Sequence, residues 1–83
     1  MPLFFLHLRA DGAVFEDREG GDWPSLAAAH DAALRSARSM LAEELLRGEL
    51  ADTWQIEISG PGGETLEVVP FTAAFTPRSR PRA

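Results

Sequence analysis

Two histidines are the residues of this chain best suited to chemistry near neutral pH. His7 lies in the hydrophobic segment LFFLHLR, residues 3–9. It could be a pH-sensitive or ligand-contacting group on a binding sheet, or a polar strand residue that hydrogen-bonds a neighbouring glutamate. His30 lies in an alanine-rich segment. It could pair with His7 in a metal or acid–base site, or stand alone at the edge of the core with one hydrogen bond.

The other polar motifs do not match a catalytic or metal-binding pattern. The acidic residues Glu16, Asp17, Glu19 and Asp22 lack the alternating aspartates and closing glutamate of a calcium loop. The GPGG segment, residues 60–63, is not followed by the lysine and hydroxyl residue of a phosphate loop. No serine has a histidine at a suggestive spacing, and the chain has no cysteine. We therefore expect no catalytic residue, metal or cofactor, and no enzymatic activity.

The charges are divided unevenly along the chain. Residues 1–76 contain all 13 acidic residues but only five arginines, which gives this part a net charge of −8. An acidic body repels phosphate groups, so we do not expect it to bind nucleic acid. The exception is the C-terminal segment, where three arginines alternate with proline and serine and could contact a phosphate backbone weakly: Arg78, Arg80 and Arg82.

The elements that position these residues follow from periodicity and turn signals. Asp11-Gly12 favours a tight hairpin turn between a strand over residues 3–9 and a returning strand over 13–17. Ser25 is suited to cap a helix over residues 26–47, and Gly48 is suited to end it. A second pair of strands is expected on either side of the GPGG turn, over residues 53–59 and 64–69.

This order predicts a two-layer α+β fold, ββαββ, in which one long helix packs on one face of a four-stranded sheet. A grasp-like order, with the first and last strands parallel in the middle, agrees with a first strand that is apolar on both faces. A chain of 83 residues has room for one domain. We expect this domain to cover residues 1–76, followed by a flexible arginine and proline tail over residues 77–83.

Alternation along the strands predicts which side chains face the helix. In the first strand, Phe4, Leu6 and Leu8 should meet the helix, and the opposite set should lie on the open face. In the last strand, Leu66 and Val68 should point inward, which places Glu67 on the open face. Glu57 should then be near His7.

The helix is too long for the sheet. Residues 26–47 would span about 33 Å, whereas strands of this length span about 20–23 Å. The overhanging end carries several leucines, and the open face carries further apolar side chains, which together leave more apolar surface than a small monomer should expose. The predicted interaction surface comprises Leu3, Phe5, His7, Arg9, Leu45, Leu46 and Leu50.

Several segments also resemble a family of small bacterial proteins defined only as a domain of unknown function. Its members open with an aromatic pair and a histidine, carry Asp-x-x-Gly before an alanine-rich helix, and close with a Trp-x-Ile strand. The resemblance covers roughly residues 1–75, and Trp23 stands where leucine is usual. It implies no activity and no catalytic residue. The matching positions are Phe4, Phe5, His7, Asp17, Gly20, Leu26, Ala29, Ala33 and Trp54.

The sequence thus predicts a small non-enzymatic module that forms a homodimer or docks to an unidentified protein. The alternative is a weak nucleic-acid-associated regulator that acts through the arginine tail. The longest apolar run is too short to cross a bilayer, and the N-terminus lacks the basic segment of a signal peptide. We therefore expect a cytoplasmic protein without membrane contact.

Overall fold

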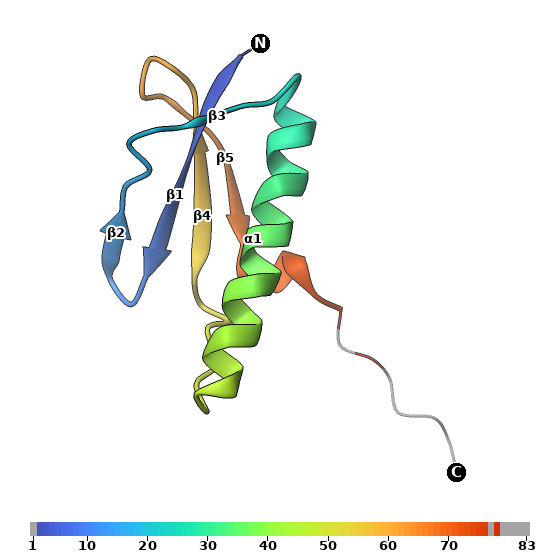
Figure 1. The fold of residues 1–83 in the computed structure, drawn as a ribbon. Helices are drawn as coiled ribbons and strands as arrows, with labels where there is room; N and C mark the ends of the chain where they lie inside the picture. Colours follow the sequence, from blue (N-terminus) through green and yellow to red (C-terminus); the bar gives the residue numbers. More distant parts are fainter. Residues whose placement is uncertain (1, 77, 79–83) are drawn as a thin grey trace.

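The computed structural model describes residues 2–76 and 78. In this part of the chain, a single α-helix packs across one face of an antiparallel sheet of five strands, which confirms the predicted α+β class (Figure 1). The elements are β1 (Leu3–Ala10), β2 (Ala13–Phe15), β3 (Gly21–Asp22), α1 (Leu26–Leu46), β4 (Gln55–Ser59), β5 (Thr65–Pro70) and the 3₁₀ helix η1 (Phe71–Ala74).

The strand order differs from the grasp-like expectation. The sheet runs β2-β1-β4-β5, so β1 pairs with β4 and not with the last strand. The physical reason is burial: Ile56, Ile58 and Ser59 of β4 are all buried, whereas most of β5 is exposed. The more deeply buried strand therefore takes the central place, and β5 forms an edge.

The expected count of four strands misses β3. This short strand adds to β1 on the same side as β2, where Leu3 faces Asp22 and Phe4 faces Gly21. No strand was expected between residues 17 and 26, because a two-residue strand leaves no periodic pattern in the sequence. The β1–β2 turn is as predicted, since Asp11 and Gly12 both have positive φ, of 51° and 80°.

Both ends of α1 are capped as the sequence indicated. The Ser25 hydroxyl accepts a hydrogen bond from the Ala28 amide at 3.1 Å, which satisfies one free amide of the first turn. At the other end Gly48 has a φ of 82°, its amide donates to Leu45, and the amide of Glu49 donates to Glu44. These two bonds form a Schellman motif, which ends the helix.

The core lies between α1 and the inner face of the sheet. Three alanines at four-residue spacing, Ala29, Ala33 and Ala37, are completely buried. Their small side chains let the helix axis approach the strands closely. The largest fully buried side chains are contributed by β4, β5 and η1: Ile56, Ile58, Val69 and Phe71.

The inward face predicted for β5 is wrong. Val69 pairs with Ile56 and Glu67 pairs with Ile58, so Val69 and Glu67 lie on the helix side, while Val68 is exposed. A register shift opposite Ile58 and Ser59 leaves Leu66 exposed as well. This register buries Val69 completely, like the neighbouring Phe71, and the removal of both side chains from water stabilises the fold.

Candidate functional site

His7 is held on the open face of the sheet by two hydrogen bonds. Its Nε2 atom lies 2.8 Å from the hydroxyl of Ser59 in β4, and its Nδ1 atom accepts a bond of 3.0 Å from the backbone amide of Asp17. Its ring stacks on that of Phe5, with an interplanar angle of 4°. The histidine thus joins the loop after β2 to the central strands.

The carboxylate of Asp17 fixes the same loop. Its oxygens accept hydrogen bonds from the backbone amides of Leu6, Glu19 and Gly20. Partial burial raises the pKa of Asp17, but the bonds from Gly20, Leu6 and Glu19 and the proximity of His7 outweigh it, so the pKa lies below its ordinary value. Asp17 therefore binds as a carboxylate at neutral pH.

Ser59, His7 and Asp17 share residue types with a nucleophilic triad, but their polarity is reversed. In a triad the histidine Nδ1–H donates to the carboxylate, so that Nε2 can take the serine proton. Here Nδ1 accepts a hydrogen bond, so in the neutral ring Nε2 carries the hydrogen and donates it to Ser59. The cluster therefore acts as a structural clamp and does not activate Ser59.

The predicted glutamate partner of His7 is wrong. Glu57 does face His7 across β1 and β4, but its carboxylate binds Arg9 at 2.5 Å. The guanidinium draws Glu57 away because a charged donor forms the stronger bond. Ser59, which no sequence pattern indicated as a partner, forms this hydrogen bond instead.

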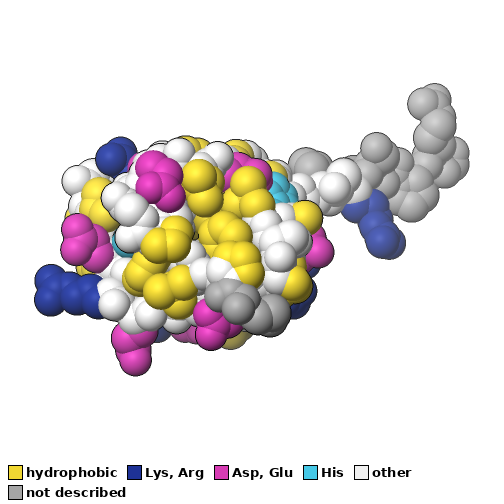
Figure 2. Space-filling view, turned by 90° about the horizontal axis from the view of Figure 1, so that it is seen from above, with side chains coloured by type: hydrophobic (Ala, Val, Ile, Leu, Met, Phe, Trp, Pro, Cys, Tyr) yellow, Lys and Arg dark blue, Asp and Glu magenta, His cyan; other side chains and the backbone are white. Residues whose placement is uncertain are grey.

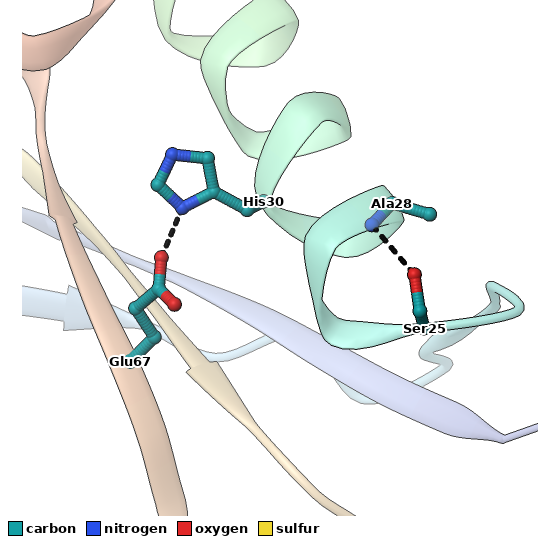
Figure 3. Close-up of polar contacts among 4 residues, drawn as sticks. All are labelled: Ser25, Ala28, His30 and Glu67. Atoms are coloured by element: carbon teal, nitrogen blue, oxygen red, sulfur yellow. Dashed lines mark hydrogen bonds and ion pairs between the residues drawn. The ribbon is translucent and has the colours of Figure 1, made fainter.

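His30 lies on the other side of the sheet. Its Nδ1 atom contacts the carboxylate of Glu67, so α1 and β5 are joined by a polar contact at the edge of the core (Figure 3). The expectation of a single hydrogen bond at the core edge is confirmed. His7 and His30 therefore do not meet, and among residues 2–76 and 78 no group of three or more His, Cys, Asp or Glu residues could hold a metal ion.

The overhanging end of α1 forms an apolar groove of about 280 Å³. We call it the helix-end groove, and it is lined by Arg38, Leu41, Ala42, Leu45, Leu50 and Phe75. The leucines predicted to be exposed here are exposed: Leu45 by 64%, Leu46 by 89% and Leu50 by 65%. Phe75, 41% exposed, was not expected, because it follows η1 and lies far from the other residues in sequence.

The open face is apolar in a different place from the one predicted. Phe5 is only partly exposed, because Gly20 packs against its ring, and Leu3 is partly exposed too. The exposed large apolar side chains of the open face are instead Val14, Leu66 and Val68. Figure 2 shows hydrophobic side chains also gathered on the end of the molecule that is seen from above, with acidic side chains around them.

The predicted nucleic-acid contacts lie at the chain end. Arg78 is exposed, and Arg80 and Arg82 lie outside the described residues. Within the described chain, no helix has both the length and the hydrophobicity needed to cross a lipid bilayer.

A comparison with known protein families finds a match. The sequence model of a family described as Domain of unknown function (DUF6894) matches residues 3–72. No curated protein and no solved structure matches the chain. The matched range holds the His7 clamp, the whole of α1 and all five strands. The protein therefore belongs to this family, a domain of unknown function.

Proposed function

We propose that this protein is a small non-enzymatic interaction module that forms a homodimer through the helix-end groove and the exposed Leu46, which follows the groove residue Leu45. The observation that carries the proposal is the row of leucines at the end of α1, of which Leu46 is 89% exposed. Each buried CH₂ group contributes roughly 0.8 kcal/mol, so covering several leucines supplies a real driving force for association.

The groove is suited to a second copy of the same chain. Ala42 lies among larger side chains and leaves a depression, whereas Leu45 and the neighbouring Leu46 protrude. In a two-fold symmetric contact, the leucines of each copy can fill the depression of the other. Antiparallel packing of the two α1 helices about Ala42 would meet this requirement.

The His7 clamp supports a non-enzymatic role, because its hydrogen-bond polarity leaves Ser59 without a general base. The expected compartment is the cytoplasm, since the chain has no cysteine to form the disulfides that stabilise many small secreted domains. The nucleic-acid alternative has less support, because the body next to the arginine segment carries a net charge of −8.

Sedimentation equilibrium over a dilution series tests the proposal. We expect a concentration-dependent dimer in the wild-type protein, weakened at least tenfold by Leu46→Glu. The matched control is Leu66→Glu, which places the same charge on an exposed leucine of the open face and should leave the dimer intact. A wild-type protein that stays monomeric at millimolar concentration, or equal effects of the two substitutions, would refute the groove as the dimer contact.

A further inference from the structure

A second cleft lies on the helix side of the sheet, between the β1–β2 hairpin and the end of α1. One part, of about 420 Å³, is lined by Leu8, Phe15 and Trp54 among others. An adjoining part, of about 340 Å³, reaches Glu49 and Leu50. Three residues line both parts, so the two parts lie next to each other: Asp11, Glu44 and Trp54. We call this space the aromatic–acidic cleft.

The part of the cleft beside the β1–β2 hairpin is mainly apolar, and its aromatic side chains are partly uncovered. Phe15 pairs with Leu8 across β1 and β2 and so faces the helix side, yet it is 59% exposed. The Trp54 indole lines both parts, and its N–H donates to Asp11 at 3.2 Å. An exposed phenylalanine next to an indole offers a surface on which a planar group can stack.

The rim of the cleft is negative. Asp11, Glu44 and Glu49 contribute carboxylates, and neither part is lined by an arginine or a histidine. Glu44 is paired with Arg47, which leaves the carboxylates of Asp11 and Glu49 to face an incoming ligand. Carboxylates beside an aromatic ring suit a guanidinium group, because it forms charge-assisted hydrogen bonds and stacks on aromatic faces.

The end of the chain begins close to this cleft. Phe75 and Leu50 both line the helix-end groove, and Leu50 also lines the aromatic–acidic cleft. In a dimer that packs groove against groove, Phe75 of each copy would lie against its partner's groove. Leu50 of that partner borders both the groove and the cleft, so Phe75 would lie close to the partner's cleft. Residues 77–83 hold three arginines and could extend at most about 25 Å from there.

We propose that the aromatic–acidic cleft binds the C-terminal arginine segment, residues 78–82, of a second copy of this chain. This inference rests on the proposed homodimer and names what its arginine segment does. The +3 charge of residues 77–83 complements the carboxylates of the cleft, and each copy both gives a segment and receives one. This exchange gives the basic end of each chain an acidic binding site on the other copy, so the basic end has a partner that is not nucleic acid.

The two tryptophans allow a direct test in the full-length chain. The readout is the indole ¹H–¹⁵N resonance of Trp54 in the cleft, with Trp23, which packs on Phe4, as the internal control. The variant Arg78→Gln/Arg80→Gln/Arg82→Gln removes the cations but keeps the chain length. Glu49→Gln removes one carboxylate of the cleft, and Glu43→Gln, on the exposed face of α1, is its matched control.

The wild-type Trp54 resonance should shift as the dimer forms, and the Trp23 resonance should not. The shift should be lost in the triple variant and at about 1 M salt, where the Debye length is only about 3 Å. The triple variant should also dimerise about 5- to 30-fold more weakly, the range expected for a few exposed ion pairs. Glu49→Gln should have a smaller effect of the same sign, and Glu43→Gln none.

The inference fails on its own if the wild-type protein dimerises but the triple variant has the same Trp54 shift and the same dimer affinity. It also fails if the Trp54 difference between wild type and triple variant is independent of concentration and persists with Leu46→Glu. The segment would then bind within its own chain. Failure of the proposed homodimer is a separate result, recognised by a wild-type protein that remains a monomer.

Discussion

The Nε2 atom of His7 and the hydroxyl of Ser59 lie 2.8 Å apart across β1 and β4, and this contact explains the histidine within an apolar strand. The amide of Asp17 donates to the other ring nitrogen at 3.0 Å. A phenylalanine or leucine at this position could make neither bond, and the loop after β2 would lose one of its attachments to the sheet. His7 therefore serves the fold by orienting its two nitrogens toward two different segments.

The contact predicts which tautomer His7 adopts. Under alkaline conditions, where imidazoles are neutral, Nε2 should carry the hydrogen, because Nδ1 accepts from an amide that cannot reverse its role. Long-range ¹H–¹⁵N correlation spectra of the imidazole distinguish the two tautomers. A ring protonated at Nδ1 would contradict the clamp and reopen a general-base role for His7, and Ser59→Ala should leave the tautomer unchanged.

Asp17 should make stability depend on acid pH. Its pKa is lower in the folded chain than in the unfolded one, so its contribution is complete above the unfolded value and disappears as the pH falls through the folded value. Asp17→Asn should cost about 1–2 kcal/mol of unfolding free energy at pH 7. Urea unfolding should show this cost shrinking below about pH 4.

The comparison needs a control for the loss of one negative charge. Asp31→Asn changes an exposed aspartate of α1 and should alter the unfolding free energy by less than about 0.5 kcal/mol. If the difference between wild type and Asp17→Asn is the same at pH 7 and at low pH, the three amide bonds to the carboxylate do not stabilise the fold.

Gly20 should tolerate no side chain. It has a φ of 72°, and a Cβ atom there would lie 2.9 Å from the Phe5 ring and 3.0 Å from the Phe4 carbonyl. Gly20→Ala should therefore lower the unfolding free energy by about 2–4 kcal/mol, since strain and steric overlap add. Gly63→Ala isolates the strain: it has a φ of 85° but nothing within 4 Å, so it should cost only about 1 kcal/mol. Equal losses on thermal or urea unfolding would show that Gly20 does not pack on Phe5.

Local signals in the sequence were enough for the parts of the fold that short-range chemistry determines. Ser25 and Gly48 mark the ends of the helix, and Asp11-Gly12 marks the first turn, because each needs only its neighbours to act. The strand order depends on competition between β4 and β5 for the place beside β1, which no local pattern encodes. The short strand β3 is likewise defined only by its pairing with β1.

The candidate site, like the fold, was predicted from the sequence only in part. The exposed leucines follow from the length of the helix compared with the strands, which is a property of the sequence alone. The partner of His7 was missed because Glu57 is taken by Arg9, and that choice depends on the geometry of three side chains at once. Phe75 and the aromatic–acidic cleft appear only when segments distant in the sequence are brought together.

The register of β5 gives the sharpest test of the fold. The alternation of Leu66 and Val68 predicts that Val68 is buried, whereas the structure buries Val69 and exposes Val68. Val69 is completely buried, whereas Val68 is 44% exposed on the open face. Val69→Ala removes two buried methyl groups and should cost about 1.5–3 kcal/mol of unfolding free energy, while Val68→Ala should cost less than about 0.5–1 kcal/mol. The two substitutions are chemically identical and one residue apart, so each controls for the β-propensity lost in the other.

Equal m-values in urea would show that both variants unfold in the same cooperative transition, so that their unfolding free energies can be compared. A larger cost for Val68→Ala than for Val69→Ala would mean that β5 is shifted by one residue, which would expose Phe71 and separate Glu67 from His30.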